Sequence, residues 1–202
     1  MFRDGFPFLD DDIVGSVIDV IPSETYRNVS LHTSSDEISY FLKQIKISFP
    51  YRLYSLEVDD AIFSKMDTTE KIILHCIYTR SCDGYVREKH VKALLTYDPP
   101  DWAIPYIVKV CDEYVVEILQ VVYDSLKDKQ TDKYKNFCAE NRETFCKSYN
   151  RMISYWNEYY KDMFFNYKDY IGRKLFIEIF GAKRKMQSRV LVADLPDNRF
   201  VT

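Results

Sequence analysis

The sequence predicts an all-α fold, and three observations support this. The 202 residues include only 5 Gly and 7 Pro, fewer turn-forming residues than turn-dense β folds need. From residue 67 onward, apolar residues recur mostly at spacings of three or four, which is the period of an amphipathic helix. A seven-residue motif also recurs in the centre of the chain, as repeated helical hairpins require.

The N-terminal 60 residues are the least regular part of the chain. The apolar run 13–21 suits a short helix or a strand, and the acidic run 10–12 is expected to cap it. Further on, Ser34 and Glu37 have the spacing of a capping box, in which both side chains bond free backbone N–H groups. We therefore predict a helix from there to Pro50, with these apolar residues at helical spacing: Ile38, Phe41, Leu42, Ile45 and Ile47.

Four helices are predicted in the central part of the chain, over about 67–79, 83–96, 101–110 and 113–126. Asp67 and Glu70 suit the first turn of one helix, and Asp83 suits the N-cap of the next. Pro105 falls within the first turn or so of the third helix if Asp101 is its cap. A missing N–H there removes little more than the earliest hydrogen bond.

Longer amphipathic segments follow towards the C-terminus. Aromatic and other apolar side chains recur between residues 134 and 167, which indicates one long helix or two nearly collinear helices. A final helix is predicted over 171–180, with Gly181 as its C-cap. We expect a single domain over 1–202 with four parts: a cap region over 1–60, repeats over 67–127, long helices over 131–182 and a basic, irregular tail over 183–202.

The repeat is the most informative feature of the sequence. The segment 82–88, Cys-Asp-Gly-Tyr-Val-Arg-Glu, recurs after 29 residues as 111–117, Cys-Asp-Glu-Tyr-Val-Val-Glu. Five of the seven positions are identical, and the same register pairs His90 with Leu119, so His90 is expected to face inward. A period near 30 that carries two helices is typical of a solenoid of helical hairpins.

The segment 83–94 resembles the second-helix signature of short HEAT-like repeats, Asp-x-x-Val-Arg-x-x-Ala-x-x-x-Leu. Its matching residues are Asp83, Val86, Arg87 and Leu94, whereas His90 replaces the alanine; in the second copy Asp112 and Val115 match. The resemblance covers about residues 68–127. It implies an α-α superhelix, or HEAT-like α-solenoid, flanked by long helices. Its second helices would line a concave binding face.

The cellular location of the protein, and whether it binds a metal or a cofactor, are predicted from motifs that the sequence does not contain. The acidic start does not suit a signal peptide, and no apolar run reaches the ~18 residues of a membrane span. The five cysteines show no CxxC spacing, which favours free thiols in a reducing compartment. We therefore expect a cytoplasmic protein without membrane association. No metal-ligand spacing, phosphate-binding loop or nucleophile motif is present, so we expect no metal site, no cofactor and no catalytic residues.

The leading hypothesis is a non-enzymatic interaction or scaffolding module that binds a protein or peptide along the second-helix face. The polar residues expected to contribute to this face are Arg87, Lys89, Lys92, Glu113, Glu117 and Gln120. Arg87 has an alternative role, because an arginine at this HEAT position often bonds a neighbouring repeat instead. A small bacterial immunity-type inhibitor is one specific version of the hypothesis. The oligomeric state is left open.

The second hypothesis is an enzyme or nucleic-acid-binding protein on the same scaffold, since a few HEAT-like proteins are DNA glycosylases or bilin lyases. A glycosylase needs an aromatic ring and a carboxylate in a basic face, for which Trp102, Trp156 and Asp101 are the candidates. A separate basic patch at the end of the chain comprises Lys183, Arg184, Lys185 and Arg189. The overall pI near 5.7 favours the protein partner over nucleic acid.

Overall fold

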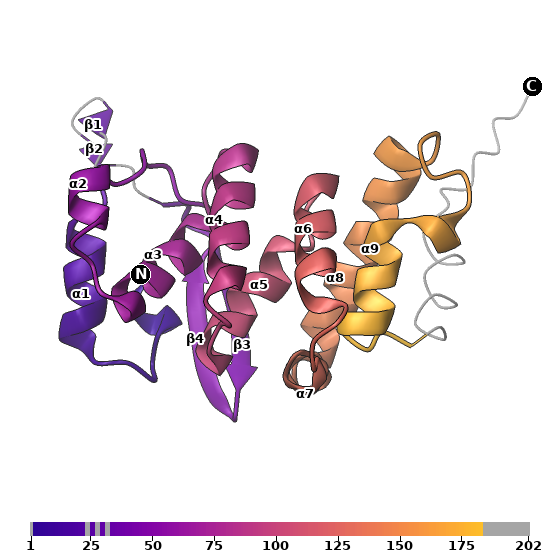
Figure 1. Ribbon diagram of the computed structural model, residues 1–202, viewed down its shortest axis with the longest axis horizontal. Coiled ribbons are helices and arrows are strands. Elements are labelled where there is room, and N and C mark those ends of the chain that lie inside the picture. Colours follow the sequence, from indigo (N-terminus) through magenta and orange to yellow (C-terminus); the bar gives the residue numbers. More distant parts are fainter. Residues whose placement is uncertain (1, 23–24, 27–28, 31–32, 184–202) are drawn as a thin grey trace, which may run out of the picture.

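The computed structural model describes residues 2–22, 25–26, 29–30 and 33–183 of the chain. Most of these residues are helical, and the described strands form two short antiparallel hairpins. The mainly helical fold that the sequence predicts is thus confirmed. The helices stand in a row along the longest axis of the molecule, from α1 at one end to α9 at the other (Figure 1).

The N-terminal part combines short helices with the two hairpins. Its elements are η1 (Arg3–Gly5), α1 (Asp11–Asp19), β1 (Thr25–Tyr26), β2 (Val29–Ser30), β3 (Glu37–Leu42), β4 (Ile45–Pro50) and α2 (Asp60–Phe63). The apolar run after the acidic residues forms helix α1, not a strand. Its N-cap is Asp10, whose carboxylate accepts a bond from the backbone N–H of Asp12 at 2.9 Å. The capping role expected for the acidic run is therefore confirmed.

The helix predicted from Ser34 to Pro50 is wrong, because this segment forms the β3–β4 hairpin. Tyr40 pairs with Ile47 across the two strands, and both side chains are buried, as is Phe49. Alternate residues therefore face the core, which is the period of a strand. The Ser34 side chain caps no helix; its hydroxyl instead accepts a bond from the backbone N–H of Arg52 at 3.0 Å.

The central part of the chain contains four helices. They are α3 (Thr68–Tyr78), which packs against α4 (Gly84–Thr96) as a hairpin, and, after η2 (Asp101–Ala103), α5 (Ile104–Val110) and α6 (Val116–Leu126). Helix α6 packs mainly against α4. The capping box of Asp67 and Glu70 is present, and Asp83 caps α4 by accepting from the N–H of Tyr85. Pro105 lies in the first turn of α5, as expected. Helix α6 starts three residues later than predicted, at Val116.

The C-terminal segment is more divided than the sequence predicts. Its elements are α7 (Asp132–Glu140), α8 (Arg142–Tyr155), the π turn η3 (Trp156–Tyr160), η4 (Tyr167–Asp169), α9 (Ile171–Lys174) and the π turn η5 (Leu175–Ile179). The expectation of one long helix or two collinear ones is wrong, since α7 runs across the end of α8 (Figure 1). Asn141 breaks the helix between them because its side chain bonds the backbone of Phe41 in strand β3. Gly181, at φ 77°, ends the last helical segment as predicted.

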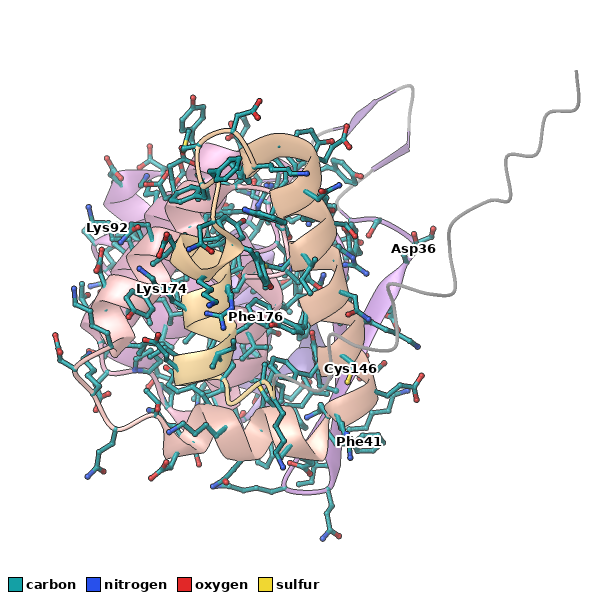
Figure 2. All side chains as sticks on the ribbon, turned by 90° about the vertical axis from the view of Figure 1, so that its right-hand side faces the viewer. Asp36, Phe41, Lys92, Cys146, Lys174 and Phe176 are labelled. Atoms are coloured by element: carbon teal, nitrogen blue, oxygen red, sulfur yellow. The ribbon has the colours of Figure 1, made fainter. Side chains whose placement is uncertain are left out.

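Helix α4 lies against α6, and α6 lies against α9 (Figure 1). Figure 2 shows Lys92 of α4 and Lys174 of α9 on the same side of the molecule. Phe176, which follows α9, is fully buried. The buried apolar residues of all parts form one continuous core, which strand β4 joins through the stacked rings of Phe49 and Tyr106, 4.2 Å apart. Within the described residues, no helix has the length and apolar character needed to cross a membrane.

Candidate functional site

The residues expected on the second-helix face divide into two groups. Lys89 and Lys92 of α4 and Glu117 and Gln120 of α6 are exposed, as a binding face requires. Arg87 and Glu113 are not part of that surface, because their side chains are only 1% and 3% exposed. Their expected exposure is corrected here: the two pair with each other, with Arg87 Nε 2.9 Å from Glu113 Oε2. Arg87 thus bonds a residue of the second copy of the sequence motif and is not free for a partner.

Glu113 is the centre of a buried cluster of three arginines. Arg52 bonds its carboxylate with two nitrogens, at 2.8 and 3.1 Å, in the bidentate geometry that arginine favours. Arg80 Nη2 lies 2.8 Å from Oε1, and Arg87 completes the set. Burial alone would raise the pKa of Glu113, but Arg80, Arg87 and Arg52 together hold it below its usual value.

Four segments of the chain bring these groups together. Arg52 follows strand β4, Arg80 follows α3, Arg87 lies near the start of α4, and Glu113 lies in the loop between α5 and α6. This loop is therefore tied to the α3–α4 hairpin and to the β3–β4 hairpin. Because a buried carboxylate is stable only with such partners, this cluster fixes the position of the loop.

A second buried carboxylate, Asp112, stands beside this cluster. Lys109 Nζ lies 2.5 Å from Asp112 Oδ1, while Ser148 and Arg151 of α8 bond Oδ2 at 2.9 and 3.1 Å. Asp112 thus has a different role from Asp83, the residue at the same position in the first motif copy: Asp83 caps a helix, whereas Asp112 forms a buried ion pair. Burial lowers the pKa of Lys109 to about 8. The loop between α5 and α6 therefore also binds α8.

Part of the cluster is exposed to solvent beside Tyr51. Arg52 lies over the ring of Tyr51 at 4.4 Å, and Lys109 lies over the same ring at 4.9 Å. The side chains of Arg52 and Arg151 are 17% and 40% exposed, whereas those of Arg80, Arg87 and Lys109 are buried. Arg52 and Arg151 are therefore the two cations of the cluster that an approaching molecule could touch.

Three further tyrosines gather beside these cations. The rings of Tyr114, Tyr155 and Tyr159 lie 6.1 to 6.3 Å apart, with Tyr114 53% and Tyr159 62% exposed. Tyr160 fixes the start of α6, because its hydroxyl donates to the carbonyl of Tyr114 and accepts from the N–H of Val116. We refer to one set of residues as the Tyr–Arg surface: Tyr51, Arg52, Tyr114, Arg151, Tyr155 and Tyr159.

A buried histidine pair lies between α3 and α4. His75 Nδ1 and His90 Nδ1 are 2.8 Å apart, and His90 Nε2 lies 2.7 Å from Glu57 Oε1. The inward orientation predicted for His90 is confirmed. Burial lowers the pKa of His75 to about 4, so both rings are neutral at pH 7. The described residues contain no group of three or more His, Cys, Asp or Glu side chains arranged to hold a metal ion.

The candidate enzyme residues do not meet in one site. Trp102 packs edge-to-face against Phe6 of the N-terminal segment, and Asp101 pairs with Lys43 of the β3–β4 turn. Trp156 instead donates its indole N–H to the carbonyl of Phe164. The glycosylase-type arrangement of these three residues is therefore not formed. Of the C-terminal basic patch, Lys183 is exposed, and Arg184, Lys185 and Arg189 lie outside the described residues.

No family model, curated protein or solved structure matches this chain. The function is therefore inferred from the geometry of the structure. Sequence reasoning overlooked Arg52 and Arg80. One signal was available for Arg80: it lies 29 residues before Lys109, so the repeat places a cation at the end of both first helices. A cation is favourable there because the last carbonyls of a helix carry partial negative charge.

Proposed function

We propose that this chain is a non-enzymatic interaction module that binds a protein partner through the Tyr–Arg surface. One observation carries the proposal: exposed tyrosine rings gather beside two partly exposed arginines. Tyrosine and arginine are enriched among the residues that dominate binding energy at protein interfaces. Both can bury a large area and also donate hydrogen bonds.

The rigidity of the surface supports this proposal. Tyr114 is held by Tyr160, and the loop that carries it is pinned by the buried ion pairs of Asp112 and Glu113. A preorganised surface loses less conformational entropy when it binds, so more of the contact energy appears as affinity. Glu113 and Arg87 then act by positioning the surface rather than by touching the partner.

The exposed second-helix face is proposed as the rim of the interface rather than its centre. Two of its four polar side chains are already bonded within the chain: Lys89 lies 2.6 Å from Glu57, and Gln120 donates to Asp124 at 2.6 Å. Exposed pairs of this kind contribute little energy and leave few free groups for a partner. Lys92 and Glu117 extend the rim on either side.

The architecture is proposed to be a HEAT-like solenoid. The 29-residue register shared by the segments that lead into α4 and α6 supports this, as does the row that α4 and α6 form with α9. Arrays of this kind serve mostly as recognition scaffolds. An immunity-type inhibitor that masks a toxin is the specific version that we favour among such scaffolds, on the grounds of small size and acidity.

A comparative capture experiment tests the proposal. The tagged chain, the double variant Tyr114→Ser/Tyr159→Ser and the control Phe41→Ser are each used to capture proteins from cells that express the chain. Phe41 is a matched control because it is an exposed ring on the β3–β4 hairpin, away from the Tyr–Arg surface. We expect a partner that the wild type and the control retain and the double variant loses.

The captured partner must then bind as a purified protein. Calorimetry should show a defined stoichiometry, with an affinity at least about tenfold weaker for the double variant, equivalent to about 1.4 kcal/mol. The proposal fails if the double variant and the control retain the same proteins, or if the purified partner does not distinguish them.

A further inference from the structure

The groups beneath the Tyr–Arg surface do not balance in charge. The cluster contains five cationic side chains and two carboxylates: Arg52, Arg80, Arg87, Lys109 and Arg151 against Asp112 and Glu113. Cation and carboxylate interact more strongly in a partly buried site than in water, so an excess of positive charge there attracts a further anion. The whole chain, by contrast, carries a net charge of −3.

Arg80 gives an independent sign that this cluster is incomplete. Its side chain is fully buried, and its Nη2 points to Glu113 and to the carbonyl of Tyr51. Among the described residues, its Nε and Nη1 have no hydrogen-bond partner. Buried guanidinium donors without acceptors are costly, so the positive charge of Arg80 is only partly compensated within the fold.

We propose that the Tyr–Arg surface receives an acidic segment of the partner protein, with an Asp or Glu side chain bound by Arg151 and Arg52. This inference rests on the proposed function and names the chemistry of its partner. Arg151 donates to Asp112 through one nitrogen, Nη1. Its partly exposed guanidinium has further N–H donors for a second carboxylate. Burial raises the pKa of the Tyr155 hydroxyl, and Arg151 lies close enough for its charge to oppose this rise, while the ring of Tyr114 packs edge-to-face against Tyr155. These two rings would cover the apolar part of the segment.

An acidic peptide fits this surface better than a nucleic acid. Tyrosine rings can stack on bases, but phosphate backbones gain most of their affinity from many solvent-facing cations. Three of the five cations here are buried, and Arg52 is mostly covered. A single well-oriented carboxylate needs only the two that reach the surface.

The test measures binding of three labelled probes by fluorescence anisotropy at low salt: a deca-glutamate peptide, a deca-lysine peptide and a ten-nucleotide oligothymidine. We expect saturable binding of deca-glutamate, weaker binding at higher salt, and no binding of deca-lysine. Arg151→Glu should weaken deca-glutamate binding at least about tenfold, and Arg151→Lys should retain part of it. Circular dichroism and the melting temperature confirm that each variant is folded.

Lys147→Glu is the matched control for Arg151→Glu. Lys147 lies one turn earlier on α8 and pairs with Glu143 rather than with the cluster. Its replacement by glutamate changes the charge by the same amount as Arg151→Glu. Its effect on deca-glutamate binding should stay within about twofold. The inference is overturned if deca-glutamate does not bind saturably or if both charge reversals weaken it equally. It is also overturned if oligothymidine binds more tightly than deca-glutamate, which would indicate a nucleic-acid surface.

The partner from the capture experiment separates this inference from the proposed function. If the partner requires Tyr114 and Tyr159 but binds Arg151→Glu with unchanged affinity, the proposed function stands and the acidic segment is excluded. If deca-glutamate binding depends on Arg151 but no partner depends on the two tyrosines, the anion subsite stands and the proposed function fails.

Discussion

Arg87 of α4 and Glu113 of the loop between α5 and α6 form a buried ion pair at 2.9 Å, which joins that loop to α4. The two residues come from the two copies of the 29-residue sequence motif. Gly84 occupies the position in the first copy that Glu113 occupies in the second, so this pair depends on a difference between the copies. The ion pair therefore fixes the Tyr–Arg surface through a contact that the first copy of the motif lacks.

Removing Glu113 should destabilise the fold strongly. Glu113→Ala leaves Arg52, Arg80 and Arg87 buried without their counter-ion, and breaking a buried ion pair in this way typically costs about 3–5 kcal/mol. Urea denaturation gives the free energy of unfolding that checks this value. Glu117→Ala, on the exposed face of α6, should change it by less than about 0.5 kcal/mol. A loss below about 1 kcal/mol for Glu113→Ala would show that the cluster does not stabilise the loop.

The central helices could be predicted from the sequence because their signals are local. Capping residues such as Asp67 and Asp83 act on N–H groups only two or three positions away. The β3–β4 hairpin could not, because its apolar residues fit a helical spacing as well as an alternating one. Its turn residues, Lys43 and Gln44, carry no glycine or asparagine signal. The carboxylate of Glu140, nearly a hundred residues later, bonds both of their backbone N–H groups.

The candidate site was predictable only in part, for a similar reason. The repeat register indicates inward positions such as His90, and it pairs Arg80 with Lys109. It does not show that Glu113 turns inward, because that depends on Arg52, which comes from a hairpin outside the repeat. Contacts between segments of different periodicity carry no pattern in a single sequence. The Tyr–Arg surface is therefore a product of tertiary structure.

Stability should fall as the pH drops from about 7 towards 5, because of the histidine pair. Burial is the largest cause that lowers the pKa of His75, to about 4. His90, Lys89 and Lys71 lower it further, whereas the carboxylate of Glu57 raises it. The unfolded value is about 6.5, so below that pH the unfolded state binds a proton that the folded state does not. The stabilisation is complete above about pH 7 and is lost as the pH falls towards 4. Between pH 7.5 and 5 the loss from His75 is about 2 kcal/mol.

The double variant His75→Ile/His90→Leu tests this origin of the pH dependence. It introduces the residues that the second repeat copy has at the equivalent positions, Ile104 and Leu119. Both partners of the hydrogen bond are removed together, so no buried ring nitrogen is left without a partner within the pair. Urea denaturation gives the free energy of unfolding at pH 7.5 and at pH 5. The fall in this free energy between the two pH values should be about 2 kcal/mol smaller in the double variant than in the wild type. An unchanged fall would mean that other groups cause the pH dependence.

Asn141 should contribute strongly to stability although it lies between two helices. Its amide accepts from the N–H of Phe41 at 2.7 Å and donates to the carbonyls of Phe41 and Phe137 at 2.6 and 2.9 Å. Asn141→Ala leaves the backbone N–H and carbonyl of Phe41 without this partner, whereas the carbonyl of Phe137 still accepts from the backbone N–H of residue 141. The loss should cost about 1–3 kcal/mol. Thermal and urea denaturation measure the loss. Asn157→Ala, at an exposed position of η3, is the control and should cost less than about 0.5 kcal/mol; equal losses would contradict the prediction.

Replacing the β3–β4 turn should stabilise the protein. Lys43 and Gln44 both have positive φ, 53° and 68°, which is strained for residues with a Cβ and typical of a type I′ turn. Asn-Gly is the preferred pair for this turn, so Lys43→Asn/Gln44→Gly should relieve strain worth about 0.5–1 kcal/mol. The backbone bonds to Glu140 are retained, and the lost pair of Lys43 with Asp101 is exposed and worth little. A reversed order, Lys43→Gly/Gln44→Asn, and the single variant Lys43→Ala separate turn geometry from the loss of charge. If Lys43→Ala stabilises the fold as much as Asn-Gly does, the gain does not come from the turn.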